Sequence, residues 1–340
     1  MRIALISDAW SPQVNGVVRT LTTTVAELRR QGHLVETITP DLFTTIACPS
    51  YAEIRLALAA GRGVRRRLER FAPDAIHIAT EGPLGWAARR WCIDHNLPFT
   101  TSFHTRFPDY LSVRTGLPAD LFWGALRRFH GRADRVFVAT PTLEAELAGR
   151  GLKQLHRWSR GVDLDLFGPE GPRLPDLEGI GGPILLHVGR IAPEKNIEAF
   201  LTSEVPGAKV VVGDGPALPL LRRAFPDVLF LGALHGERLA AAYRSADVFV
   251  FPSCTDTFGL VMVEALASGV PVAAFPVPGP LDVVPQGAGV LDNNLAAAIR
   301  GALKLDRGTV AKTGRSFSWA RCTGQFLTGL IPLSKMAEAA

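Results

Sequence analysis

The stretch VFVFPSCTDTFGLVMVEALASGVPVAAF, residues 248–275, decides the fold. It begins with a short apolar run, passes through a polar loop into an apolar helical segment, and ends with a second apolar run. Runs rich in β-branched and aromatic residues, joined by a helix, are typical of parallel strands buried on both faces. The stretch therefore predicts a strand–helix–strand unit with a polar loop at the carboxyl end of its first strand.

The same alternation extends through both halves of the chain. The first half contains the runs RIALIS, LVETIT, AIHIA, FTTSF and RVFVAT, and the second contains ILLHVG, KVVVG, VLFLG, VFVFP and VPVAAF. Amphipathic stretches separate these runs, which is the pattern of an α/β fold. We therefore expect two tandem Rossmann-like domains with a central cleft, and ligand sites at the carboxyl ends of the strands.

Length and composition predict the domain boundary. A chain of 340 residues exceeds the size at which one hydrophobic core keeps growing. The segment GPEGPRLPDLEGIGGP, residues 168–183, is rich in Gly, Pro and acidic residues, so it predicts a linker. We expect an N-terminal domain over residues 1–167 and a C-terminal domain over 184–340. A C-terminal amphipathic helix, residues 316–331, is expected to pack back on the N-terminal domain.

The composition argues against several classes of protein. The N-terminus lacks the pattern of a signal peptide, and no apolar run is long enough to span a bilayer. The four cysteines form no CxxC pair, which disfavours a zinc cluster and a disulfide scaffold. We therefore expect a cytoplasmic protein, peripheral on the inner face of the cell membrane, with no nucleic-acid partner.

The net charge lies in the first half of the chain. Residues 171–340 carry equal numbers of basic and acidic side chains, so the formal charge of +5 belongs to residues 1–170. The densest group of basic residues in this half, residues 62–70, has two interpretations: a helix that rests on an anionic membrane surface, or an ordinary solvated helix face. Its arginines occur among apolar residues at helical spacing, and they are Arg62, Arg65, Arg66, Arg67 and Arg70.

Two segments that follow predicted strands suit a diphosphate. After RIALIS, Asn15-Gly16 precedes a helix, and a glycine there lets phosphate approach backbone N–H groups; a simple tight turn is the alternative. After ILLHVG, Arg190 and Lys195 would stabilise the growing charge of a leaving diphosphate. The alternative for these two cations is surface pairing with neighbouring glutamates at 194 and 198.

A third segment, TDTFGLVMVEALASG, suits a sugar and a ribose. Asp256 lies in the loop after VFVFP, Gly259 opens a helix, and Glu264 follows about one and a half turns later. An acid in an otherwise apolar helix rarely lacks a partner. The alternative is a helix whose N-terminus is stabilised by one acid and which carries another further in.

In this order, Gly16, GRIAPEKN and TDTFGLVMVEALASG resemble the retaining glycosyltransferases of family GT4, which have the GT-B fold. The resemblance covers nearly the whole chain, and its third motif is highly specific. The family has two carboxylates separated by seven residues, matched here by Asp256 and Glu264. The usual first member is glutamate, so Asp256 is shorter by one methylene.

The resemblance implies a role for each site residue. It places the donor diphosphate on Gly16, Arg190 and Lys195, the ribose on Glu264, and the hexose hydroxyls on Asp256 and the backbone of Phe258 and Gly259. His104, in TTSFHTRFPDYL, matches the family histidine beside the transferred sugar, although a lone histidine there is more often structural. The implied catalytic residues are thus His104, Arg190, Lys195 and Asp256, and the acceptor-side candidates are Asn15, Arg106, Phe107 and Tyr110.

The implied reaction is transfer of a hexose, with retention, from a nucleotide diphosphate sugar to an acceptor hydroxyl. Neither a metal nor another cofactor is implied, because cationic side chains and helix N-termini supply the positive charge. The donor is a UDP-hexose, a UDP-hexuronic acid or GDP-mannose. The expected acceptor is a membrane lipid such as diacylglycerol, and α-mannosyl transfer from GDP-mannose to a glycan or phospholipid is the alternative.

Other functions remain to be separated from this one. A phosphorylase or an epimerase with the same architecture would form different products, and a non-catalytic nucleotide-sugar-binding protein would turn over nothing. Asp163-Leu164-Asp165 has the DxD form of a metal site, but it lies near the linker and is interpreted as structural. Gly213-Asp214-Gly215 lacks the third glycine of a dinucleotide fingerprint, and the histidines show no close metal-binding pair.

Overall fold

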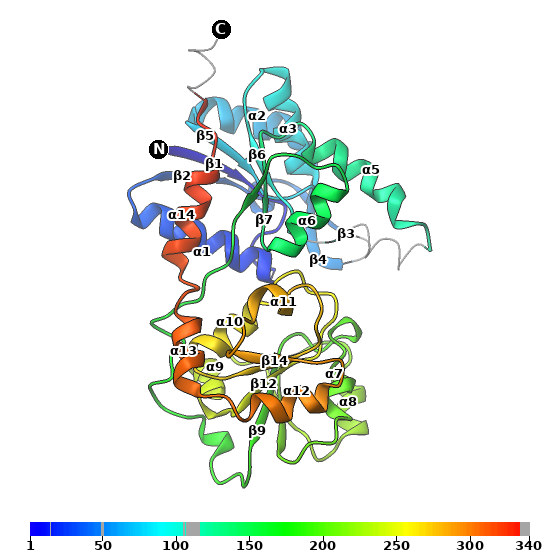
Figure 1. Cartoon of the computed structure of the whole chain (residues 1–340). Coiled ribbons are helices and arrows are strands. Elements are labelled where there is room, and N and C mark those ends of the chain that lie inside the picture. Colours follow the sequence, from blue (N-terminus) through cyan, green and yellow to red (C-terminus); the bar gives the residue numbers. More distant parts are fainter. Residues whose placement is uncertain (14, 49–50, 105, 107–115, 334–340) are drawn as a thin grey trace. The chain divides into compact units, whose positions relative to one another are not determined.

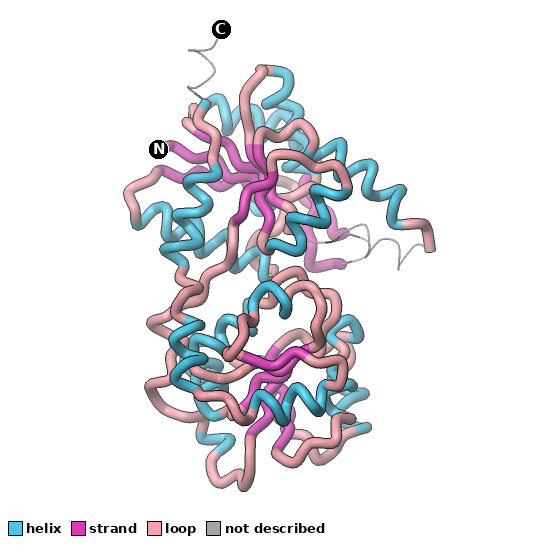
Figure 2. The backbone as a smooth tube through the Cα atoms, viewed as in Figure 1, coloured by secondary structure: helices cyan, strands magenta, loops and turns pink. Residues whose placement is uncertain are grey.

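The computed structural model describes the whole chain except residues 14, 49–50, 105, 107–115 and 334–340. It divides into two compact units. The N-terminal unit comprises Met1–Ser159 and the segment from Trp319 onward, and the C-terminal unit comprises Arg160–Ser318. Each unit contains a six-stranded parallel sheet flanked by helices (Figures 1 and 2).

The sheet of the N-terminal unit has the order β2-β1-β5-β6-β7-β8, and a separate antiparallel hairpin pairs β3 with β4. Parallel pairing runs through the whole sheet, for example Ile3 opposite Val35 on one side and Ala75 on the other. The elements are β1 (Arg2–Ile6), α1 (Gly16–Arg30), β2 (Leu34–Ile38), η1 (Pro40–Leu42), β3 (Thr45–Cys48), β4 (Tyr51–Ala57), α2 (Ala60–Phe71), β5 (Ala75–Ile78), α3 (Pro83–Asp94), β6 (Thr100–Ser102), α5 (Ala119–His130), β7 (Arg135–Val138), α6 (Pro141–Gly149), β8 (Leu155–Arg157) and α14 (Trp319–Gly329).

The sheet of the C-terminal unit has the order β11-β10-β9-β12-β13-β14, again parallel throughout. Its elements are η2 (Pro175–Leu177), β9 (Ile184–Val188), η3 (Pro193–Lys195), α7 (Ile197–Leu201), β10 (Ala208–Val212), α8 (Leu218–Ala224), β11 (Leu229–Gly232), α9 (Gly236–Ser245), β12 (Val248–Phe251), α10 (Leu260–Ala267), β13 (Val272–Ala274), α11 (Pro280–Val283), β14 (Gly289–Leu291), α12 (Leu295–Ala302) and α13 (Arg307–Gly314). The predicted strand–helix–strand unit is thus β12–α10–β13.

Burial of both sheet faces explains why the central strands are continuous apolar runs. Successive residues of a strand point to opposite faces. In β1, Ala4 and Ile6 pack with the cluster that includes residues of α2 and α3, whereas Ile3 and Leu5 pack with residues of α1 and α14. A strand covered in this way favours apolar side chains, and every residue of RIALI after the half-buried Arg2 is apolar and buried.

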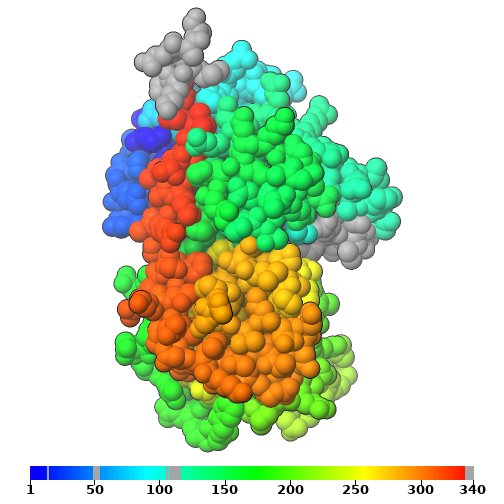
Figure 3. Space-filling model, in the orientation of Figure 1, coloured from blue at the N-terminus to red at the C-terminus, as the bar shows by residue number. Residues whose placement is uncertain are grey.

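The C-terminal helix α14 belongs to the N-terminal unit. Phe326 lies in the same core cluster as α1 and β1, and Arg135 donates from its guanidinium to the carbonyl of Thr328 at 2.8 Å. Figure 3 shows this red segment beside the blue surface of the first residues. The helix covers an apolar sheet face that α1 alone does not fill.

The division of the chain differs from the expected one at residues 160–183. The expected linker packs on the C-terminal unit, where Leu174 and Leu177 are buried. The backbone N–H of Leu174 donates to Ser245 Oγ at 2.8 Å, and Arg244 donates to the carbonyl of Pro172 at 2.8 Å. The boundary therefore falls at Ser159–Arg160 and not at 167, because glycine and proline also suit a segment that follows a surface closely.

Each sheet reverses its strand order at one point. In the N-terminal unit, β2 lies on one side of β1 and β5 on the other, and in the C-terminal unit β10 and β12 flank β9 in the same way. Loops that leave the carboxyl ends of such neighbouring strands run in opposite directions and leave a crevice. Ligand-binding residues are therefore expected at the β1/β5 and β9/β12 reversals.

Candidate functional site

The β9/β12 reversal brings together two predicted site residues. Lys195 ends the η3 turn that follows β9, and Asp256 lies in the loop between β12 and α10. Lys195 Nζ donates to both carboxylate oxygens of Asp256, at 2.6 and 2.8 Å. The side chains are 24% and 22% exposed, so the pair is accessible to a ligand. Lys195 thus pairs with Asp256 and not with its neighbouring glutamates.

The backbone around this ion pair is fixed by Asn196 and Gly279. Asn196 has a left-handed conformation with φ of 52°, and its side-chain amide donates to the carbonyl of Pro252 at 3.1 Å. A Cβ on Gly279, whose φ is 96°, would lie 2.7 Å from the carbonyl oxygen of Asp256. The loop before α11 therefore abuts the Asp256 loop, a contact that the sequence motifs did not reveal. Arg190, directly after β9, is exposed at the same edge of the sheet.

Helix α10 begins at the same edge. Its N-cap is Gly259, with φ of 82°, where a Cβ would lie 2.8 Å from Met262 Cε and 3.0 Å from Phe251 Cζ. A glycine is required there by both conformation and space. Glu264 is 1% exposed and accepts a hydrogen bond from the phenol of Tyr243 at 2.9 Å. The expectation that an acid in this apolar helix has a partner is confirmed.

The Gly213-Asp214-Gly215 segment has a structural explanation. Both glycines have positive φ, and a Cβ on Gly213 would lie 1.8 Å from the carbonyl oxygen of Gly189. A Cβ on Gly215 would lie 2.3 Å from the carbonyl oxygen of Ile191. These glycines let the loop after β10 follow the loop after β9 closely, which shapes the backbone beside Lys195.

A buried histidine lies beneath the ion pair. His187 on β9 is 1% exposed, and its Nδ1 lies 3.1 Å from the carbonyl of Val250, to which only an N–H can donate. The pKa of His187 is lowered to about 4, chiefly by burial and to a smaller extent by the Lys195 ammonium; the hydrogen bond to Val250 and the Asp256 carboxylate act in the opposite direction. The ring is therefore neutral at pH 7 and adds no charge to the site.

At the edge of the N-terminal sheet, Asn15 and Gly16 start helix α1. The side-chain oxygen of Asn15 accepts from the N–H groups of Val17 and Val18, both at 3.0 Å. Asn15 is thus the N-cap, and its oxygen satisfies two of the N–H groups that a helix start leaves open. Gly16 is the first residue of the helix and is exposed.

The other predicted residues of this unit lie after β6. His104 is 8% exposed, and its ring packs edge-on against Trp158 with a centroid distance of 5.7 Å. Arg106 forms an ion pair with Glu146 on α6. Phe107 and Tyr110, the two aromatic acceptor-side candidates, lie outside the described residues.

The sequence motifs missed Asp8, which follows β1 at the β1/β5 reversal. It is 6% exposed and accepts hydrogen bonds from the N–H groups of Leu84 at 2.9 Å and Gly85 at 3.2 Å, and from the Thr80 hydroxyl at 3.0 Å. Burial raises the pKa of Asp8, although these donors favour its charged form. The position of Asp8 directly after a buried strand was the one signal in the sequence that could have identified it. Its hydrogen-bond donors lie more than 70 residues away, so no local motif reveals them.

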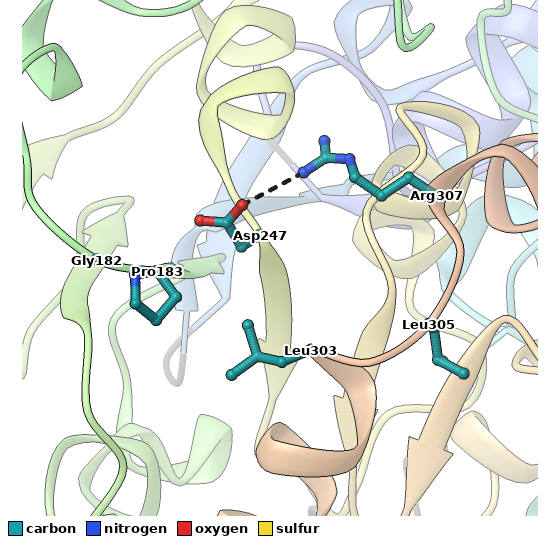
Figure 4. Close-up of a pocket in the computed structure, with 6 residues that line it drawn as sticks. All are labelled: Gly182, Pro183, Asp247, Leu303, Leu305 and Arg307. Carbon is teal, nitrogen blue, oxygen red and sulfur yellow. Dashed lines mark ion pairs between the residues drawn. The ribbon is translucent and has the colours of Figure 1, made fainter.

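Two cavities of the C-terminal unit lie away from these residues. One, of about 380 Å³, is lined by Gly182, Pro183, Asp247, Leu303, Leu305 and Arg307 (Figure 4). Because Pro183 and Asp247 directly precede β9 and β12, this cavity lies at the opposite, amino-terminal edge of the sheet. The other, of about 470 Å³, is bordered by residues 164–170, with Glu237, Arg244, Ala267 and Arg315.

Metal clusters and membrane-spanning helices are absent from the part of the chain that the structure describes. Among the described residues, no three His, Cys, Asp or Glu side chains are grouped so as to hold a metal ion. No helix in the same part of the chain has both the length and the apolar character needed to cross a bilayer. The Asp163 carboxylate of the DxD segment instead accepts from the N–H groups of Asp165 and Leu166, at 3.1 and 3.2 Å.

Solved structures share this architecture. A sucrose-phosphate synthase from Thermosynechococcus elongatus matches with a TM-score of 0.76 at 24% identity and 99% coverage of both chains. HepE of Anabaena, in complex with UDP, matches with a TM-score of 0.70 at 17% identity, over 96% of this chain and 99% of that one. The fold is GT-B, as the sequence predicted.

Sequence comparisons identify the family. The model for Glycosyltransferase Family 4 matches residues 14–166, and that for Glycosyl transferases group 1 matches residues 182–305. A GDP-mannose-dependent alpha-mannosyltransferase of Mycobacterium tuberculosis is 33% identical over 86% of this chain and 83% of its own. An alpha-monoglucosyldiacylglycerol synthase of Streptococcus pneumoniae is 30% identical over 81% of this chain and 71% of its own. With its two matched halves and GT-B fold, the chain belongs to glycosyltransferase family 4.

Proposed function

We propose that this glycosyltransferase moves a hexose, with retention and without a metal, from a nucleotide diphosphate sugar to a hydroxyl of a membrane lipid. The observation that carries the proposal is the Lys195–Asp256 pair at the β9/β12 reversal, beside the start of α10. An ammonium and a carboxylate there match the two halves of a donor, a diphosphate and a polyhydroxylated ring.

Donor binding would exchange the partners of this ion pair. The diphosphate takes over Lys195, with Arg190 beside it, and Asp256 turns to accept hydrogen bonds from hexose hydroxyls. The backbone at Phe258 and Gly259 lies at the N-terminus of α10, where N–H groups favour an anion. Glu264 binds the ribose, and the N–H groups at the start of α1, at Gly16, are a further candidate contact for a phosphate.

Retention follows if the acceptor attacks from the face that the diphosphate leaves. The bond between the anomeric carbon and the phosphate oxygen breaks, the bond to the acceptor oxygen forms, and the hydroxyl proton passes to the leaving diphosphate. Lys195 and Arg190 stabilise the growing phosphate charge, so no metal is needed for that purpose. His104 lies beside the transferred sugar in this scheme.

The names of the relatives support two donors. One relative is a GDP-mannose-dependent alpha-mannosyltransferase, and another is an alpha-monoglucosyldiacylglycerol synthase. A thermal-shift panel of UDP, GDP and ADP with the corresponding sugars separates the donors, because a bound ligand raises the melting temperature by mass action. We expect one nucleotide series to stabilise the protein and the others to leave it unchanged; no shift with any of them contradicts donor binding.

An assay of transfer tests the reaction. Purified protein, the donor found above and diacylglycerol in detergent should release nucleoside diphosphate and form a glycolipid with α-configuration, and EDTA should change the rate by less than about twofold. Binding without product formation would indicate a nucleotide-sugar-binding protein. Release of a sugar phosphate in the presence of phosphate would indicate a phosphorylase, and loss of activity in EDTA would exclude the metal-independent mechanism.

The proposed membrane surface includes helix α2. Arg62, Arg65, Arg66 and Arg70 are exposed, whereas Arg67 is half-buried, 3.7 Å from Glu36. Four solvent-facing arginines on one helix suit anionic headgroups, at about 1 kcal/mol each near such a surface. One of them, Arg65, also lies 3.3 Å from Glu69 in an exposed ion pair that contributes little.

An apolar hairpin face adjoins this helix in the sequence. In the β3–β4 register Ile46 is opposite Leu56, and the N–H of Leu58 donates to the carbonyl of Thr44, so Ile46, Leu56 and Leu58 share one face. Ile46 is 49% exposed and Leu58 is 45% exposed. Exposed apolar side chains next to a basic helix are typical of proteins that rest on a lipid interface.

Vesicle co-sedimentation tests this surface. Changing Arg62, Arg65 and Arg66 to Glu should abolish binding to phosphatidylglycerol vesicles, and raising the salt concentration should weaken binding of the wild type. The matched control changes Arg222, Arg223 and Arg238, which are exposed on the C-terminal unit, to Glu. Equal losses in both variants would show that only net charge matters, and no binding by the wild type would exclude a lipid-docking helix.

A further inference from the structure

We propose that Tyr243 is a positioning residue that fixes the carboxylate of Glu264 for the ribose of the donor. This inference rests on the proposed function, in which Glu264 binds the ribose. Tyr243 lies on α9 and Glu264 on α10, and the phenol donates to Glu264 Oε2 at 2.9 Å. Tyr243 is fully buried, and Glu264 is 1% exposed.

The ring of Tyr243 is held by aromatic neighbours. Phe167 lies edge-on to it, with a centroid distance of 5.8 Å and an interplanar angle of 77°. Phe249 of β12 lies at 5.8 Å with an angle of 59°. A ring packed in this way places its hydroxyl at one point in space. Phenylalanine would occupy the same volume, so packing alone does not require the hydroxyl.

The single hydrogen of the phenol has two acceptors on α10. Glu264 Oε2 lies at 2.9 Å, and the carbonyl oxygen of Val261 lies at 3.3 Å. A hydrogen bond to an ionised carboxylate is shorter and stronger than one to a neutral carbonyl, so the hydrogen belongs on Glu264. A buried carboxylate also requires such a donor, because its desolvation is costly.

The hydrogen bond controls a torsion that is otherwise poorly defined. The last torsion of a glutamate side chain is broad, so the plane of the carboxylate is not set by rotamer preference. A donor held in place on Oε2 sets that plane. A ribose hydroxyl that donates to the carboxylate then meets an oxygen in a fixed position, which reduces the ordering required on binding.

Isothermal titration calorimetry with nucleotides and their deoxy forms tests the inference. The ligands are UDP, GDP, 2′-deoxy-UDP and 2′-deoxy-GDP, titrated into the wild type, Tyr243→Phe, Glu264→Gln and the double variant. We expect Tyr243→Phe to weaken binding of the preferred ribonucleotide about tenfold and to reduce its preference over the deoxynucleotide to about twofold. In the Glu264→Gln background, Tyr243→Phe should have less than about a twofold effect, because the amide oxygen that replaces the carboxylate forms only a weaker, neutral hydrogen bond with the phenol.

Phe167→Leu is the matched control for packing. It loosens the Tyr243 ring but keeps the hydroxyl and the contact with Phe249, so it should lower the melting temperature while reducing the ribose preference less than Tyr243→Phe does. If Tyr243→Phe keeps the wild-type ribose preference, or acts equally in the Glu264→Gln background, the positioning role is wrong while the donor site stands. If the wild type binds neither UDP nor GDP, or Glu264→Gln binds as tightly as the wild type, the ribose role of Glu264 fails and this inference with it.

Discussion

The two sheets reverse their strand order in the same way but use the carboxylate at the reversal differently. After β1, Asp8 is buried and accepts from the N–H groups of Leu84 and Gly85 in the helix that follows β5. After β12, Asp256 pairs with Lys195, and both are about a fifth exposed. The first carboxylate cannot leave without uncapping a helix, whereas the second lies in a partly exposed ion pair, in which we propose that a phosphate replaces it. The same topology therefore yields a buried helix-capping contact in one unit and a candidate ligand site in the other.

The largest expected effect comes from Lys195→Ala. Turnover should fall by about two orders of magnitude or more, because a charged contact to the leaving diphosphate is lost. The unfolding transition should stay within about 1 kcal/mol of the wild type, since the ion pair is partly exposed. Lys304→Ala, an exposed lysine of the same unit, is the control and should keep wild-type turnover. Turnover of Lys195→Ala within a few-fold of the wild type would remove Lys195 from the site.

Acid should weaken each unit through one buried histidine. Burial lowers the pKa of His77 to about 3 and that of His187 to about 4. Their neutral forms contribute stability that is fully present above the unfolded pKa of about 6.5 and is lost as the pH falls towards these values. For His187 the loss amounts to about 3 kcal/mol by pH 4.

The tryptophans separate the two effects. All six lie within residues 1–159 or at 319, so their fluorescence reports on the N-terminal unit, and circular dichroism reports on both. His77→Gln should flatten the pH dependence of the unfolding transition followed by fluorescence. His187→Gln should leave that transition unchanged and flatten the pH dependence of the transition of the C-terminal unit, which only circular dichroism detects. A fluorescence transition whose pH dependence responds to His187→Gln would show that the units unfold as one.

Removal of the two carboxylates compares the reversals directly. Asp8→Ala should lower the free energy of unfolding by about 2 kcal/mol, because buried N–H groups at the start of α3 lose their acceptor. Asp256→Ala should change it by less than about 1 kcal/mol, since a partly exposed ion pair contributes little. Urea unfolding monitored by fluorescence measures the stability of Asp8→Ala, and urea unfolding monitored by circular dichroism measures that of Asp256→Ala. Equal losses of unfolding free energy in the two variants would contradict the distinction between Asp8 as a helix-capping residue and Asp256 as a ligand-binding one.

The smallest expected effect concerns the cap of α1. Asn15→Ala should destabilise the N-terminal unit by about 1 kcal/mol, because the side-chain oxygen that accepts from Val17 and Val18 is lost. Asn15→Ser keeps a capping oxygen and should restore most of this stability. If Asn15→Ser is stable but binds the acceptor more weakly than the wild type, the amide also contacts the acceptor; unchanged binding assigns Asn15 to the cap alone.

Local patterns in the sequence were sufficient for ten strands and for the position of the three motif segments after strands. Strands β3, β4, β8 and β14 lie outside the predicted apolar runs. Apolar runs such as RIALIS and ILLHVG correspond to β1 and β9 because a strand buried on both faces favours apolar side chains, and a polar one there, such as His187, needs a hydrogen-bond partner. The motif residues lie after strands because a polar loop must follow a buried strand before the next helix. These features depend on neighbours within a few positions, which a sequence displays directly.

Contacts across long stretches of chain were decided only by the tertiary structure. Lys195 meets Asp256 61 residues later, and Asp8 caps a helix that begins 75 residues later, because strand order places β9 beside β12 and β1 beside β5. Tyr243 reaches Glu264 because α9 and α10 pack together, although nothing near Tyr243 in the sequence distinguishes it from a core aromatic residue. The sequence by itself determined which residue types follow each strand; the packing of whole sheets and helices determined which of them meet, because hydrogen bonds and ion pairs require distances of about 3 Å that only the folded chain sets.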